Sequence, residues 1–283
     1  DVSSAARDPE LMILRGLSPL VLVPIANPRH AAALVSVAQA LAPVEVGRIL
    51  LLSVVVVPRG WTREDDPQPL ANAQKVLGES ISAAAQKGLF PEALTTIGPD
   101  PWSEIARVAR SHRCESLLLG LSDLEKDNSG APIGKLLSRI DTDAVILRAP
   151  SGWDPAEAKR ILVPMAGHGH HDRLLVRMLS SLSRASSPTI TVMKVLPEEI
   201  SDARLAVAER GLKSRARDLR VGGPTETRAV AHADAVQAVA EEAEKHDLVI
   251  MGTERSGRNR AFGSFTLAVA RKTEVPLLLI SHA

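Results

Sequence analysis

The sequence predicts an α/β protein built from two tandem five-stranded parallel sheets, each wrapped by helices. Short runs of Val, Leu and Ile alternate with longer helical segments, which is the pattern of repeated βαβ units. Three of these apolar runs occur twice: 21–24 and 161–164, 117–120 and 249–252, and 144–147 and 277–280. A period of about 130 to 140 residues indicates a duplicated domain, because solenoid repeats span only about 20 to 50 residues.

The first copy contains five runs of branched apolar residues, which suit parallel strands buried on both faces. We expect these strands at 20–24, 48–57, 93–97, 116–120 and 144–148. Ala-rich or amphipathic segments between them predict helices at 29–41, 70–88, 101–112 and 132–140. Pro101 stands where a helix accepts proline, in its first turn.

Residues 149–155 interrupt the pattern with two prolines and a glycine, which is typical of a linker. After it the second copy predicts strands at 160–164, 189–195, 225–230, 248–252 and 276–281, with helices at 171–184, 200–219, 234–245 and 264–272. The expected organisation is a connector (1–17), a first domain (18–150) and a second domain (151–283). The last strand of each copy is an apolar edge, and such edges are usually covered. We therefore predict that strands 144–148 and 276–281 pair with each other.

Composition excludes several classes of function. The 283 residues carry a net charge of +1, from 34 basic and 33 acidic residues, so no nucleic-acid partner is expected. The single cysteine, Cys114, permits no intrachain disulfide and favours a reducing, cytoplasmic setting. It should pack as a small apolar group. The first residue is Asp1, so we expect the chain to follow a longer upstream region.

No pattern of catalytic residues is found, and an enzyme is not predicted. The sequence has no hydrolase elbow, no zinc-ligand spacing and no phosphate-binding loop with a lysine. His168, His170 and His171 are close in sequence, but neighbouring residues rarely point into one site, and no metal is predicted there. Ser264 has two interpretations, a helix cap or a phosphate contact, and the cap is favoured.

The loop after the fourth strand of the second copy begins at Gly252 and ends with Gly263-Ser264 at the start of a helix. This stretch resembles the universal stress protein family, whose nucleotide-binding members carry Gly-x2-Gly-x9-Gly-Ser/Thr here. Such glycines let phosphates approach the backbone and the positive end of a helix. The resemblance makes Gly252, Arg255, Gly257, Gly263 and Ser264 the candidate nucleotide-binding residues. Arg255 replaces the second motif glycine, and the spacing is two residues short.

The first copy departs further from that motif. Asp123 replaces the second glycine, Gly134-Lys135 replaces Gly-Ser, and the loop carries three carboxylates that would oppose a polyphosphate. The family also places an Asp after its first strand, where this chain has Ala26 and Ala166. We therefore expect no cofactor, with ATP bound by the second copy as the alternative.

The opening stretch 18–28, Ser-Pro-Leu-Val-Leu-Val-Pro-Ile-Ala-Asn-Pro, resembles the tandem stress-protein-like tails of some transporters. These are cation-chloride cotransporters and amino-acid permeases of the amino acid–polyamine–cation superfamily. The resemblance implies a non-catalytic regulatory or assembly domain on the cytoplasmic side of the cell membrane. Its partners would be an upstream transmembrane domain of the same polypeptide and a second copy in a homodimer. The alternative is a soluble tandem universal stress protein that binds ATP or a related nucleotide.

Overall fold

The computed structural model describes most of the chain beyond residue 18. The described residues are 19–42, 47–58, 60–62, 64, 66–121, 132–165, 172–219, 222–253 and 262–282. The predicted connector 1–17 lies outside them. None of the helices in these ranges is long and apolar enough to cross a membrane.

Strands and helices alternate along the chain, as the sequence predicts. In chain order they are β1 (Leu20–Pro24), the 3-10 turn η1 (Pro28–His30), α3 (Ala31–Leu41), β2 (Arg48–Val56), α4 (Gln68–Gln86), β3 (Glu92–Gly98), α5 (Pro101–Ser111), β4 (Ser116–Gly120), α7 (Pro132–Leu137), β5 (Asp143–Arg148), the 3-10 turn η2 (Pro155–Glu157), β6 (Arg160–Pro164), α8 (Asp172–Ser186), β7 (Thr189–Leu196), α9 (Asp202–Asp218), β8 (Thr225–Ala231), α10 (Ala235–Ala243), β9 (Leu248–Thr253), α11 (Ser264–Lys272) and β10 (Leu277–Ser281).

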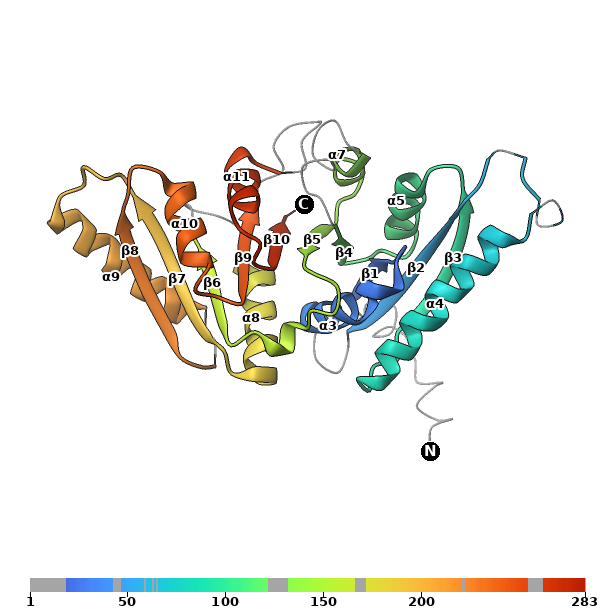
Figure 1. Cartoon of the computed structure of the whole chain (residues 1–283), viewed down its shortest axis with the longest axis horizontal. Helices are drawn as coiled ribbons and strands as arrows, with labels where there is room; N and C mark the ends of the chain where they lie inside the picture. The colour runs from blue at the N-terminus through green and yellow to red at the C-terminus, as the bar shows by residue number, and fades with distance from the viewer. Residues whose placement is uncertain are drawn as a thin grey trace.

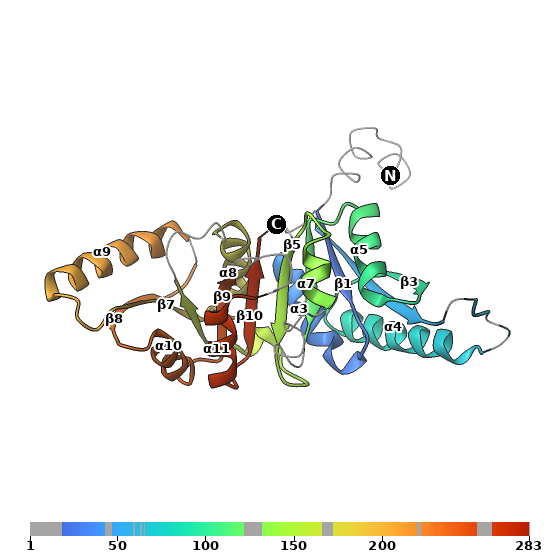
Figure 2. The same ribbon diagram turned by 90° about the horizontal axis from the view of Figure 1, so that it is seen from above.

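The ten strands in the described ranges belong to one sheet, in the order β3-β2-β1-β4-β5-β10-β9-β6-β7-β8. Each half of it is parallel, as predicted, and we call β1–β5 with their helices the first unit and β6–β10 with theirs the second unit. The halves meet where β5 and β10 pair antiparallel, with Ile146 opposite Leu279. The predicted pairing of the last strands is therefore confirmed, and it joins the two expected sheets into one. The molecule is elongated, with α4 and α9 near its opposite ends (Figures 1 and 2).

A hydrophobic core lies on each face of the sheet, and each core contains residues of both units. On one face α3 and α8 pack over the sheet, where Val145 and Leu278 lie in the same cluster. On the other face α5, α7, α10 and α11 pack over Ile146 and Leu279. Because successive strand residues point to opposite faces, the joint contributes to both cores. The two units consequently share their cores instead of closing each around its own.

Polar contacts reinforce the joint at its rims. The guanidinium of Arg148, on β5, donates to the carbonyls of Ala270, Thr273 and Val275 in the second unit, at 2.5, 2.7 and 2.7 Å. On the α3 and α8 face, Arg177 donates to the Leu41 carbonyl at 3.1 Å. Two of these contacts, to Leu41 and Ala270, place charged donors at carbonyls in the last turn of a helix, which carry partial negative charge.

The segment predicted as a linker is packed against the structure. Pro155 is buried and Trp153 packs against the core beneath α3 and α8. Asp154 accepts from the Ala156 N–H at 3.1 Å, which caps the turn η2, and it pairs with Lys87 of the first unit at 2.5 Å. The connection between the units is therefore held in place by both of them.

Candidate functional site

Each half of the sheet has one position where the strand order reverses, between β1 and β4 and between β6 and β9. In open parallel sheets, ligands bind beyond the carboxyl ends of the strands at this position. Gly120 ends β4, and Gly252 lies one residue before the end of β9. The motif glycines of the sequence therefore lie at the crevices where the fold favours ligand binding.

In the second unit, the two ends of the candidate loop are brought together. The Gly263 N–H donates to the Thr253 hydroxyl at 3.4 Å, and Thr253 is buried at the end of β9. Phe262, just before the helix, is fully buried in the core of that face. Gly252, Gly263 and Ser264 consequently lie near one another, as the motif requires. Arg255 and Gly257 lie outside the described residues.

The N-terminus of α11 has the features of an anion-binding helix end. Gly263 is its N-cap in an extended conformation and makes no side-chain capping bond, and the first turn has no acidic residue. Free backbone N–H groups and the helix dipole favour a negative group at such an end. The favoured interpretation of Ser264 as the cap is wrong, because Ser264 is already the first helical residue.

In the first unit, the corresponding positions are explained by packing. A Cβ added to Gly120 would lie 3.2 Å from Cδ1 and 3.3 Å from Cδ2 of Leu34, a buried residue of α3. Gly120 therefore leaves space for a leucine at the crevice. Gly134 lies inside α7, two residues after its start, so it does not open a helix as the motif glycine would. Asp123 lies outside the described residues.

The second unit has a leucine at the position that corresponds to Leu34. Leu174 follows Leu34 by 140 residues, the same offset as between the first strands, and it is also buried in the core beneath α3 and α8. Ala26, where the family has Asp, is exposed, and the next residue, Asn27, uses its side chain to cap η1 through the Arg29 N–H at 3.0 Å.

The described ranges contain no cluster of side chains suited to a metal ion. No group of three or more His, Cys, Asp or Glu side chains there could hold a metal ion. The three histidines weighed as metal ligands lie outside the described residues. Cys114 is 6% exposed in the core, and burial raises the pKa of its thiol to about 11. The prediction that it packs as an apolar group is confirmed.

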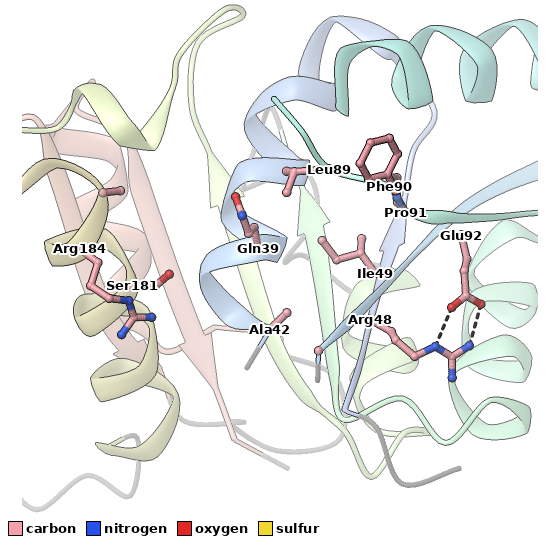
Figure 3. Close-up of a pocket in the computed structure, with 12 residues that line it drawn as sticks. Gln39, Ala42, Arg48, Ile49, Leu89, Phe90, Pro91, Glu92, Ser181 and Arg184 are labelled. Atoms are coloured by element: carbon pink, nitrogen blue, oxygen red, sulfur yellow. Dashed lines mark hydrogen bonds and ion pairs between the residues drawn. The ribbon is translucent and has the colours of Figure 1, made fainter. Parts of the chain in front are cut away.

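A groove that sequence reasoning missed lies at the opposite ends of the strands of the first unit. It has a volume of about 500 Å³ and is lined by the starts of β2 and β3 and by the C-terminal halves of α3 and α8 (Figure 3). At its rim Arg48 and Glu92 form a bidentate ion pair at 2.6 and 2.7 Å. That hydrogen-bonded pair lowers the pKa of the Glu92 carboxyl.

Comparison with known proteins identifies the fold. Residues 157–281 match the Universal stress protein family. A universal stress protein from Archaeoglobus fulgidus DSM 4304 superposes with a TM-score of 0.66 at 17% identity, covering 95% of this chain and 98% of that one. The fold is that of the universal stress proteins. At such identity the likeness establishes the fold alone.

Two further solved structures cover almost the whole chain. A putative universal stress protein from Pseudomonas aeruginosa UCBPP-PA14 has a TM-score of 0.59 and 14% identity, with 95% of each chain covered. The cytoplasmic domain of a prokaryotic cation chloride cotransporter also has a TM-score of 0.59 and 14% identity, covering 94% of this chain and 96% of that one. No curated protein matches the chain. The same fold is thus found in stress proteins of similar length and in a transporter domain.

Proposed function

We propose that this chain is a non-catalytic regulatory and assembly domain of a secondary transporter, on the cytoplasmic side of the membrane. The observation that carries the proposal is the close approach of Leu34 to Gly120, which accounts for the motif glycine of the first unit without a ligand. A duplicated fold with two open pockets would favour a ligand sensor. A motif glycine that serves packing, together with cores shared by both units, favours a rigid platform whose surfaces act on partners.

The partner class is supported by two likenesses. The opening stretch 18–28 resembles that of transporter tails, and the chain superposes nearly end to end on the cytoplasmic domain of a cation chloride cotransporter. Its partners would then be an upstream transmembrane domain of the same polypeptide and a second copy in a homodimer. The solute would be an inorganic ion or an amino acid.

Two measurements test this proposal. The reading frame upstream of Asp1 should encode several membrane-spanning helices. In vesicles that contain the full-length protein, deletion of residues 19–283 should alter solute flux by at least severalfold without abolishing it. A reading frame that starts near Asp1, or a flux that the deletion leaves unchanged, would overturn the proposal.

The uncapped N-terminus of α11 favours a second candidate, nucleotide binding by the second unit. Titration calorimetry with ATP tests this candidate. Gly263→Asp is an informative variant, because it should affect phosphate binding without weakening the helix. An Asp at this N-cap should hold or raise helix stability, because its carboxylate can accept the first-turn N–H groups. The same charge would repel a phosphate. ATP binding that Gly263→Asp abolishes would support the candidate, and no heat at millimolar ATP would remove it.

A further inference from the structure

The groove between the two units continues along α3 and α8. The volume of about 500 Å³ near the starts of β2 and β3 adjoins a second hollow of about 280 Å³. Both are lined by Gln39 of α3 and by Ser181 and Ala185 of α8. One wall therefore belongs to the first unit and the other to the second unit (Figure 3).

The groove carries an apolar side chain that has no cover among the described residues. Phe90 is 86% exposed, and it is the most exposed of the large hydrophobic residues in these ranges. Ile49 and Leu89 lie beside it and are partly buried against the core. Large aromatic side chains are usually well buried, and an exposed one in a groove is typical of a binding surface.

The chain itself enters the structure at the rim of this groove. The Arg48 N–H, at the start of β2, donates to the Pro19 carbonyl at 2.9 Å, and Arg48 lines the groove. A run of four apolar residues precedes Pro19 by five to eight positions and consists of Leu11, Met12, Ile13 and Leu14. An extended chain spans about 3.3 Å per residue, so they can reach roughly 16 to 26 Å from Pro19. The groove is within that reach.

We propose that residues 10–15 bind in the groove, with the apolar run 11–14 against Phe90. Charge supports this choice of occupant. Arg184, on the α8 wall, makes no ion pair with another residue that the structure describes, and Glu10 directly precedes the apolar run. Arg48 at the opposite rim is already paired with Glu92. The segment would thus lie with its acidic end toward α8 and its apolar side on the floor.

This docking would place the segment across the joint between the units. Both walls of the groove would contact it, so a pull on residues before 10 would act on α3 and α8 together. Under the proposed function, the upstream membrane domain would be coupled to the joint by this contact. The docking itself does not rest on that function, and it is tested without membranes or transport.

Crosslinking of the full chain tests the proposal. Met12→Cys combined with Ser181→Cys places two thiols on the segment and on the α8 wall, while native Cys114 is buried and stays unreactive. The control pair is Met12→Cys with Ser138→Cys, since Ser138 is exposed after α7, on the other face of the sheet. A short bismaleimide should link the first pair within one chain at least tenfold faster than the control pair.

A third substitution shows whether the contact is specific. Phe90→Ser should reduce the rate of the first pair to that of the control and should raise amide hydrogen exchange of residues 11–15 at least tenfold. Phe90 is almost fully exposed, so the fold should tolerate the change. Equal rates for the two pairs, or exchange that Phe90→Ser does not change, would overturn the proposal. A crosslink between chains that disappears on dilution would overturn it in favour of a second copy as the occupant.

Discussion

Replacement of Arg148 by Met tests how firmly the two halves of the sheet are joined. The guanidinium donates three hydrogen bonds to carbonyls around the C-terminal end of α11. One carbonyl belongs to Ala270 in the last turn, and the other two belong to Thr273 and Val275, which follow the helix. Hydrogen bonds from a charged donor contribute about 1.5–3 kcal/mol each. Desolvation opposes them, since burial lowers the pKa of Arg148 and thus disfavours its charged form. Returning the guanidinium to water recovers several kcal/mol. The net loss in free energy of unfolding should be about 2–4 kcal/mol.

Urea denaturation followed by circular dichroism measures this loss. Arg148→Lys is the informative companion, because an ammonium keeps the charge but not the planar fork that reaches three carbonyls, so its loss should be intermediate. Arg210→Met is the control, since Arg210 is an exposed residue in the middle of α9 and its removal should change stability by less than about 0.5 kcal/mol. If Arg148→Met and Arg210→Met cost the same, Arg148 does not secure the joint and the reasoning fails.

Three other outcomes follow from the structure. Native Cys114, with a thiol pKa of about 11 against an ordinary 9.0, should react with iodoacetamide at pH 8 at least about 100-fold more slowly than in urea. Gly120→Val should lower the free energy of unfolding by about 1–3 kcal/mol because its side chain would press on Leu34, and by less when Leu34 is also Ala. The pKa of Glu92 is lowered, so its ion pair with Arg48 adds stability above about pH 4.5, and this stability is lost as the pH falls through the folded-state pKa. The contribution to the free energy of unfolding should be less than about 1 kcal/mol, because both side chains are about half exposed. Glu92→Gln should remove this pH dependence, which urea denaturation at a series of pH values measures.

The strands could be predicted because their sequences are unambiguous. Runs such as Leu20–Pro24 and Ser116–Gly120 consist mostly of residues that pack on both faces of a parallel sheet, and the structure has them at the predicted bounds. The ends of the helices were harder to predict, because side-chain hydrogen bonds to the backbone decide where a helix begins. The predicted helix 29–41 is an α-helix only from Ala31, after a 3-10 turn capped by Asn27. The pairing of the last strands followed from the need to cover apolar edges.

The candidate site was only partly predictable. Sequence likeness located Gly252 and Gly263, but the hydrogen bond from Gly263 to Thr253 depends on how the loop returns to β9. A buried Phe262 beside a motif glycine was the available signal, because aromatic residues are scarce in this chain. Leu34 gave no signal at all, since a helical leucine that packs on a distant glycine looks like any other core residue.

The groove shows most clearly what sequence alone lacks. Its lining comes from three separated stretches, 39–49, 89–92 and 181–185, and only the antiparallel joint brings the third beside the first two. Because β5 and β10 pair antiparallel, the strands of the two units run in opposite directions. The two crevices, which lie beyond the carboxyl ends of the strands, therefore open in opposite directions along the strands. An occupant of the groove would contact both units, because each unit contributes one of its walls. Under the proposed function, a signal that has to move both units together would therefore be received between α3 and α8.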